Sequence, residues 1–463
     1  MAFDKHKMDL TTGNIPLQVL KYMVPSALAF LLQMVFHATD VAVVGHFAAD
    51  AKASVAAVGG PGPVISLLSC LFIGFSAGIN AVTARFIGAQ DHRNVSRCVH
   101  TAVVMGVILG AIILLLGFLI GKPFLHLLKV PSDVLDSAYD YLVITLLGMP
   151  GLVMYNFGCA ILRSRGDTKR PMWYLGISGV INAVLNVLFV AVFHLDVKGV
   201  ALATAISKYA AALMVIYTLM HTPGACKFSF AAAHIDVSIL KKFLYNGIPA
   251  GVQSGCFGVA NMLVFGALNS FGAEALAAST VCMFPEHAIY AWTESLHQTA
   301  LSFAGQNLGA KKYSRITGSF RWCFFYMAVI CLIMGITEYL NIGQLVELFM
   351  HEPNEKVLEY ARIRGMFVLL PCILSGLQSL LTGVLRGLGY AIFPAVAAIL
   401  GVCVYRVLWI LYVFPFHHTY NYVVVTFPVS YIIVAVLSGI TLFFVLRKFK
   451  REFGQPEKAA AAQ

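Results

Sequence analysis

Charged residues are scarce in this sequence: Asp, Glu, Lys and Arg make up 11% of its 463 residues, against about 25% in ordinary soluble domains. That deficit argues against a water-soluble enzyme of two or three domains. The ten cysteines form no C-x-x-C pair, and the chain contains no phosphate-binding loop, zinc motif or catalytic triad. Metal, redox and soluble-enzyme chemistry therefore have no support in the sequence, and we expect no cofactor.

Hydrophobic residues, by contrast, make up 59% of the chain. They lie in long continuous stretches that do not alternate with polar residues, a pattern that favours membrane helices over a β-barrel. The sequence predicts an all-α integral membrane protein with twelve transmembrane helices, each able to cross roughly 30 Å of hydrocarbon. The predicted spans are 15–46, 54–86, 94–120, 135–162, 171–194, 199–221, 239–268, 275–306, 316–338, 357–385, 391–414 and 422–446.

Basic residues predict the orientation of these spans. Most of the 32 Lys and Arg lie in loops that twelve spans place on the same side as both termini. By the positive-inside rule we expect both termini to be cytoplasmic. The membrane we expect is the cytoplasmic (inner) membrane of a bacterium. The net charge of +11 is then a topology signal with some attraction to anionic lipid, and we expect no nucleic-acid partner. Five basic residues lie in or beside spans: Lys21, Lys208, Arg362, Arg364 and Arg406.

The two halves of the chain resemble each other. Leu162-Arg163-x-x-Gly166-x-x-x-x-Pro171 recurs in the second half from Leu385 to Pro394, and Gly88–Ala89 recurs at nearly the same offset as Gly309–Ala310. Six spans per repeat give both copies the same orientation, so these are parallel, pseudo-symmetric repeats, which is a transporter architecture. The sequence predicts an N-terminal six-helix bundle over 1–225 and a C-terminal one over 226–463.

Several motifs together resemble the multidrug and toxic compound extrusion (MATE) family. They are the D-x-x-x-x-G element from Asp40 to Gly45, the R-x-x-G-D stretch from Arg163 to Asp167, the opening Gly247–Gly251 of the seventh span, and G-Q-N-x-G-A at Gly305–Ala310. The resemblance implies a V-shaped pair of bundles that exports organic cations, drugs or other amphipathic compounds in exchange for H⁺ or Na⁺. Small-molecule substrates and membrane lipid are the partners it implies, with the transporter acting as a monomer.

Asp40 is the one acidic residue well inside a predicted span of the first half. A carboxylate at bilayer depth costs roughly 2.5–3.5 kcal/mol on insertion scales, which makes it a functional candidate. Gln33 and His37 share the helix face of Asp40, and we expect these two residues to line the substrate cavity. The alternative for Asp40 is a hydrated position near the extracellular end. His37 is either a proton relay or a packing residue.

The family resemblance implies partners for Asp40. DinF-like members combine the first-helix Asp with an Asn, a second acid four residues later and a Thr on the sixth helix, which become Asp40, Asn182, Asn186 and Thr204. An amide therefore replaces the second carboxylate at position 186. Two carboxylates about 4 Å apart repel by about 4 kcal/mol at an effective dielectric constant of about 20, and this repulsion is absent here. Proton coupling through Asp40 is favoured, and Na⁺ bound at these four residues is the alternative.

The second half has different polar residues. Asn261 stands at the position that corresponds to Asp40, and the seventh span has no acid. The eighth span carries Glu286, Tyr290 and Glu294 on one face, with opposite charge available from Arg406. These four residues would suit an organic cation in a substrate cavity. A structural Glu–Arg pair is the equal alternative.

The expected function is secondary active multidrug efflux: an antiporter that works by alternating access and is not an enzyme. Two rivals stay open at this point. One is a lipid-linked saccharide flippase of the same superfamily, which would have a more cationic cavity and often extra spans. The other is an integral-membrane transferase, which would need a polar catalytic cluster at one membrane face and would not need the repeat.

Overall fold

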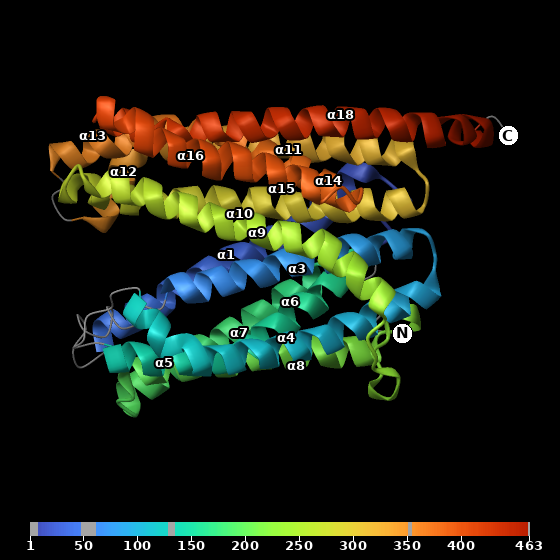
Figure 1. The fold of residues 1–463 in the computed structure, drawn as a ribbon, viewed down its shortest axis with the longest axis horizontal. Helices are drawn as coiled ribbons and strands as arrows, with labels where there is room; N and C mark the ends of the chain where they lie inside the picture. The colour runs from blue at the N-terminus through green and yellow to red at the C-terminus, as the bar shows by residue number, and fades with distance from the viewer. Residues whose placement is uncertain (1–7, 48–61, 128–134, 351–353, 462–463) are drawn as a thin grey trace. The chain divides into compact units, whose positions relative to one another are not determined.

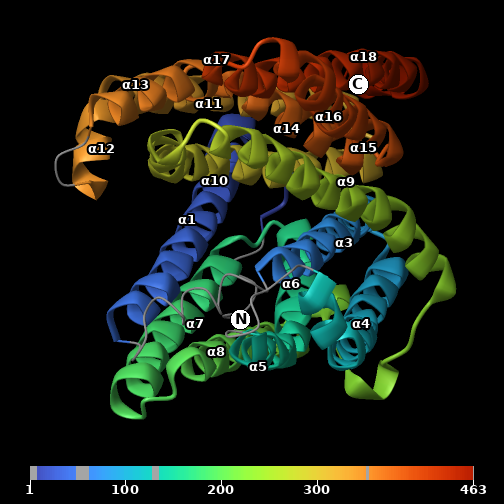
Figure 2. The same cartoon turned by 60° about the vertical axis from the view of Figure 1, so that its left-hand side comes forward.

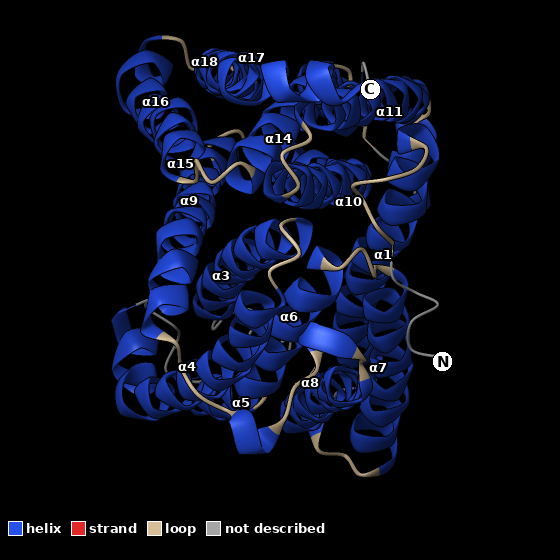
Figure 3. Ribbon diagram, turned by 90° about the vertical axis from the view of Figure 1, so that its right-hand side faces the viewer, coloured by secondary structure: helices blue, strands red, loops and turns tan. Residues whose placement is uncertain are grey.

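The computed structural model describes residues 8–47, 62–127, 135–350 and 354–461, and the regular elements in these ranges are all helices (Figures 1 and 3). The main helices are α1 (Ile15–Phe47), α3 (Gly62–Gly88), α4 (His92–Leu127), α5 (Leu135–Leu147), α6 (Met149–Ser164), α7 (Lys169–Val187), α8 (Asp196–His221), α9 (Val237–Asn269), α10 (Ala273–Gly309), α11 (Tyr313–Leu340), α12 (Ile342–Phe349), α13 (Glu355–Arg364), α14 (Cys372–Gly387), α15 (Ile392–Ala398), α16 (Tyr405–Leu408), α17 (Tyr420–Val424) and α18 (Thr426–Ala461).

These helices confirm the predicted all-α membrane fold. Within the described ranges, eleven helical stretches are long and apolar enough to cross a bilayer. The remaining predicted span, the eighth, is α10, whose 37 residues are also long enough. Its sequence is more polar because it carries many buried hydrophilic side chains, among them Glu286, His297, Gln298 and Asn307. A polar helix inside a membrane protein is stable when its polar groups face other helices instead of lipid.

Several predicted spans are interrupted, and some of the interruptions occur at corresponding positions in the two halves of the chain. The fourth span breaks into α5 and α6 beside Pro150, and the tenth breaks into α13 and α14 at Pro371, the corresponding place in the second half. Proline has no amide hydrogen to donate inside a helix, so it is tolerated where a new helix begins. The fifth and eleventh spans contain π-helical turns at Leu188–Val192 and Trp409–Val413, which again correspond in the two halves. The backbone therefore carries the same duplication as the sequence.

The structure explains the L-R-x-x-G motif of both halves. Gly166 and Gly389 follow α6 and α14 with φ angles of +87° and +93°, a left-handed conformation that glycine adopts at low cost. The amide after each glycine donates to the carbonyl oxygen five residues back, at 3.0 Å for Asp167 and 2.9 Å for Tyr390. This is the Schellman arrangement that ends helices, so the motif marks two matching helix ends.

Contacts divide the chain into two compact units. The first includes Leu28–Gly247, and the second joins Leu10–Ala27 to the chain from Ile248 onward. The first part of α1 thus packs within the second unit, and the first part of α9 packs within the first. Pro25 and Pro249 lie within two residues of these two crossing points. The predicted division into 1–225 and 226–463 follows the sequence repeats. The packing units differ from it, because each unit also includes one segment from the other half of the chain.

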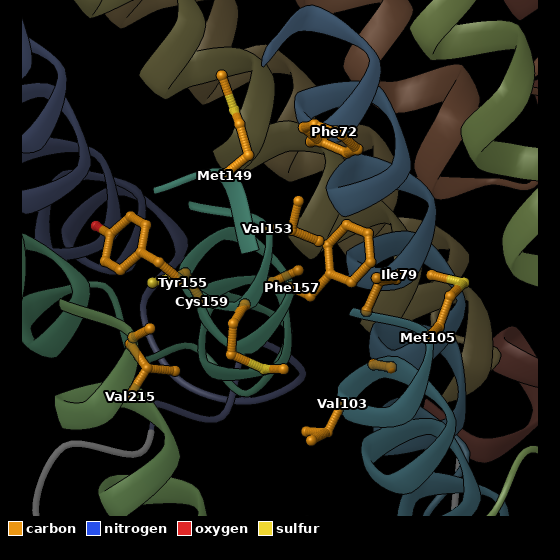
Figure 4. Close-up of a cluster of buried hydrophobic side chains, with 14 of the residues drawn as sticks. Phe72, Ile79, Val103, Met105, Met149, Val153, Tyr155, Phe157, Cys159 and Val215 are labelled. Atoms are coloured by element: carbon orange, nitrogen blue, oxygen red, sulfur yellow. The ribbon is translucent and has the colours of Figure 1, made fainter. Parts of the chain in front are cut away.

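In the first unit, α6 lies among the other helices (Figure 2). Its apolar side chains, including Val153 and Phe157, meet Ile79 of α3, Met105 of α4 and Val215 of α8 in one buried cluster (Figure 4). Glycines on α6 let α8 approach closely, as small residues do between membrane helices. A Cβ atom at Gly151 would lie 3.0 Å from the backbone carbonyl carbon of Lys208.

In the second unit, the G-Q-N motif at the end of α10 holds the segment that precedes α1. Gln306 Oε1 accepts a hydrogen bond from the Leu10 amide at 3.1 Å, and Asn307 Nδ2 donates to the Leu10 carbonyl at 3.1 Å. Arg315 adds hydrogen bonds to the carbonyl oxygens of Thr12 and Gly13, both at 2.9 Å. The motif therefore fixes the chain just before the first membrane helix.

Candidate functional site

The structure joins Asp40 to the three residues that the family resemblance assigned to it. Asn186 Nδ2 donates to Asp40 Oδ1 at 2.5 Å and to Asn182 Oδ1 at 3.2 Å. Asn182 Nδ2 in turn donates to Thr204 Oγ1 at 3.3 Å. One hydrogen-bonded row thus runs from α1 through α7 to α8 inside the first unit. We call these four residues the Asp40 row.

Helix geometry accounts for this row. Asn182 and Asn186 are one turn apart on α7 and are 5% and 0% exposed, so both amides face the interior. An unpaired amide in such a place would be costly, and the row supplies hydrogen-bond partners. One acceptor is left over: Asn186 Oδ1 is buried and has no hydrogen-bond partner in the described structure. The row therefore offers one carbonyl oxygen for an additional ligand or donor.

Gly179 brings α1 against α7. A Cβ atom at Gly179 would lie 1.8 Å from the ring of Phe36, which means that the ring occupies the space a side chain would need. Phe36 is one turn before Asp40 on α1, and Asn182 is one turn after Gly179 on α7. The ring packed on glycine therefore sets the helix spacing at which Asp40 reaches the amides.

This packing makes a prediction for Gly179→Ala. The methyl group would displace the Phe36 ring and move α1 from α7, so we expect drug efflux to fall about tenfold in cells that express the variant. Gly176→Ala is the matched control, because a Cβ atom there meets only a Leu32 methyl group, at 3.8 Å. The double variant Phe36→Ala/Gly179→Ala should recover most of the efflux. Equal efflux by Gly179→Ala and Gly176→Ala would contradict the role of Gly179 in setting the distance between α1 and α7.

Two further residues, which the sequence did not link to Asp40, lie within electrostatic range of its carboxylate. The charge of Asp40 acts on the hydroxyl of Tyr141 on α5 and on the ammonium group of Lys208 on α8. Lys208 was recognised only as a basic residue within a span. Its relation to Thr204, four residues earlier on the same helix face, is the signal that could have found it.

The other predicted cavity residues of α1 do not join this row in the described structure. Gln33 lies on an exposed face of α1. The side chain of His37 lies outside the part of the chain that the structure describes, so its expected place beside Asp40 stays a prediction.

The second unit contains a buried ion pair that differs from the expected one. The sequence offered Arg406 as the opposite charge for Glu286, but Glu286 pairs with Arg364, with Nε–Oε1 at 2.6 Å and Nη2–Oε2 at 2.9 Å. The two residues are 6% and 1% exposed. Parallel hydrogen bonds of this kind are the strong form of an Arg–carboxylate pair. The sequence alone could not identify Arg364 as the partner of Glu286, because it does not say which helix packs against α10.

Arg406 has other partners in the second unit. Its guanidinium donates to Asn261 Oδ1 at 2.7 Å and to Ser430 Oγ at 2.8 Å, and it lies 4.5 Å from the centre of the Phe427 ring. Asn261, the counterpart of Asp40, therefore binds an arginine. A matching acidic ion site is not present at this position.

The remaining predicted residues of α10 have separate contacts. Tyr290 shares a hydrogen bond with the hydroxyl of Tyr431 at 2.7 Å, and Glu294 Oε1 accepts one from Gln298 at 3.1 Å. Glu294 is half-buried and does not take part in the Glu286–Arg364 pair. Glu338 of α11 was not among the predicted site residues; its buried Oε2 atom has no hydrogen-bond partner in the described structure.

Comparisons with known proteins assign the chain to a protein family. The family model described as MatE matches residues 25–188 and again 249–410, one match in each half. The chain is 26% identical over 389 residues to a probable multidrug resistance protein, YoeA, of Bacillus subtilis, which covers 82% of this chain and 83% of the relative. It is 24% identical over 376 residues to an FAD transporter of Shewanella oneidensis, covering 80% of this chain and 81% of the relative.

A solved structure has the same fold. It is the outward-facing conformation of a multidrug resistance MATE family transporter of the MOP superfamily, with a TM-score of 0.87, 18% identity and coverage of 96% of this chain and 98% of that one. At this identity the likeness concerns the fold alone. The duplicated family match carries the assignment: this chain belongs to the MatE family, the multidrug and toxic compound extrusion transporters.

Proposed function

We propose that this protein exports amphipathic organic cations and drugs from the cell by alternating access, in exchange for H⁺ taken up at Asp40. One observation carries the proposal: a carboxylate inside a membrane helix is hydrogen-bonded at 2.5 Å to a fully buried amide. An acid inside a membrane span is costly, and such residues mark functional sites by default. The names of relatives, among them a multidrug resistance protein, support drugs as substrates.

The donor pattern supports H⁺ over Na⁺ as the coupling ion. Both Asn186 hydrogen bonds use its NH₂ group, so Asn186 presents a donor to Asp40 and not the carbonyl oxygen that Na⁺ would need. A proton neutralises Asp40 without needing the shell of oxygen ligands that a hard metal cation needs.

Protonation of Asp40 changes its hydrogen bonding with Asn186. While Asp40 is ionised, the Asn186 NH₂ group makes a charge-assisted hydrogen bond to it. When Asp40 takes up a proton, that bond weakens and the carboxyl group becomes a donor. The free Asn186 Oδ1 atom can then accept the new O–H after the amide rotates. We propose that this change between α1 and α7 lowers the affinity for a cationic substrate.

A drug-accumulation assay tests the proposal. In a bacterial host without its own drug pumps, expression should lower steady-state ethidium accumulation severalfold. A protonophore should abolish the difference, whereas a Na⁺ ionophore at constant membrane potential should leave it intact. Ethidium accumulation that expression does not change would contradict drug export, and loss of efflux with the Na⁺ ionophore would assign Na⁺ as the coupling ion.

Asn186→Asp is expected to change the ion dependence. A second carboxylate beside Asp40 adds about 4 kcal/mol of repulsion at about 4 Å, and this repulsion is relieved when either H⁺ or Na⁺ binds. Efflux by the variant should therefore be stimulated by Na⁺ at constant pH, as measured in vesicles, while the wild type is insensitive. The control is Asp40→Asn/Asn186→Asp, which moves the single carboxylate across the row and should lose the Na⁺ response. A Na⁺-insensitive Asn186→Asp protein would contradict the proposed site.

A further inference from the structure

Lys208 is a positive charge at the middle of a membrane helix. It lies close to the midpoint of α8, a helix of 26 residues, so it is about 18 Å from either end at a rise of about 1.5 Å per residue. A lysine side chain is too short to reach the membrane surface from this depth. The charged form of Lys208 therefore needs compensation inside the protein.

Within the described residues, no carboxylate forms an ion pair with Lys208. The residue makes neither a hydrogen bond nor an ion pair there, although the charge of Asp40 acts on it. Lys208 is half-buried, so protein atoms do not cover all of its surface. Behind it, Gly151 of α6 packs against the Lys208 backbone and leaves no room there for another ligand.

The ammonium group belongs to the Asp40 site by position. Thr204 is one turn before Lys208 on α8 and receives a hydrogen bond from Asn182. Residues four apart share a helix face, so Lys208 extends the Asp40 row by one further turn. The site thus has an acid at one end and a base at the other. A purely cationic ligand would use Asp40 and be repelled by Lys208.

We propose that Lys208 is a subsite for an anionic group and that the substrates of this transporter include amphiphiles with a carboxylate beside their cationic group. This inference rests on the proposed function of the Asp40 site and names a substrate class for it. The cationic group lies at Asp40 and the carboxylate at Lys208. Removing the charge of Asp40 leaves Lys208 as the dominant charge, which weakens binding of cations and favours binding of carboxylates.

Rhodamine B and its ethyl ester test this subsite, because they differ only in whether the carboxylate is free. Binding to the purified full-length protein is measured by equilibrium dialysis against protein-free micelles. We expect Lys208→Met to weaken rhodamine B binding about tenfold and to strengthen ester binding two- to threefold. Lys208→Arg should retain rhodamine B binding. Asp40→Asn should have the reverse selectivity and weaken the ester more than rhodamine B.

Controls separate the possible failures. Lys122→Met removes an exposed lysine that pairs with Asp136 at 2.9 Å and should change neither dye. Each variant's unfolding midpoint is measured alongside its binding. If Lys208→Met changes both dyes equally or neither, or if the wild type binds only the ester, the anionic subsite is overturned while cation transport at Asp40 stands. If the wild type binds neither dye, the proposed function itself is contradicted.

Discussion

Replacing Asp40 with Asn is expected to abolish gradient-driven drug efflux. The variant keeps the shape of the side chain and a hydrogen bond to Asn186, but it can neither gain nor lose a proton. Substrate binding and ion binding then lose the shared group through which they compete. In inside-out vesicles energised by a pH gradient, efflux should fall to the level of vesicles without the protein.

Asp140→Asn is the matched control for this experiment. Asp140 lies on α5 in the same unit and forms an exposed ion pair with Lys198 at 2.8 Å. Exposed pairs of this kind contribute about 0–1 kcal/mol, so efflux should stay within twofold of the wild type. Both variants should elute as monodisperse protein. Gradient-driven efflux by a folded Asp40→Asn protein would remove Asp40 from the mechanism.

Replacing Arg364 with Met should have the largest effect on stability. The change leaves the Glu286 carboxylate buried without its partner, and breaking a buried ion pair in this way costs about 3–5 kcal/mol. The unfolding midpoint in detergent should fall by several degrees. Most of the ten cysteines are buried, so a thiol-reactive dye reports unfolding directly.

Two companion variants distinguish a structural pair from a substrate site. Arg362→Met changes an exposed arginine two residues away on α13 and should leave the midpoint unchanged. Glu286→Gln/Arg364→Met removes both charges and should recover most of the lost stability. If the pair is structural, this double variant also transports ethidium at the wild-type rate. Stable protein that has lost ethidium efflux would instead assign Glu286 and Arg364 to the substrate cavity.

Much of the fold could be predicted from the sequence, because its signals are local. Long apolar stretches gave the spans, and the repeated L-R-x-x-G motif marks helix ends that the structure closes at Gly166 and Gly389 with left-handed backbone. From the sequence, Pro150 and Pro371 were expected to bend their helices, and the structure instead begins a new helix beside each of them. Proline within a span is compatible with either a bend or a new helix, and tertiary packing selects between them.

The candidate site was predictable where residues share a helix and unpredictable where two helices meet. Asn182 and Asn186 are one turn apart on any α-helix, so their common face followed from spacing. The cost of an acid inside a span singled out Asp40, and the family resemblance linked it to these amides and to Thr204. Lys208 and Arg364 were each seen as basic residues in or beside a span. Their neighbours, Asp40 and Glu286, lie on other helices, and sequence spacing does not say which helices pack together.

Proton release on substrate binding is the most direct test of the claim that Asp40 carries the coupling ion. Saturating ethidium is added to purified transporter in weakly buffered solutions over a range of pH values, and a pH-sensitive dye records the protons set free. The account predicts proton release by the wild type and none by Asp40→Asn, with Asp140→Asn equal to the wild type. Equal proton release by Asp40→Asn and the wild type would contradict it.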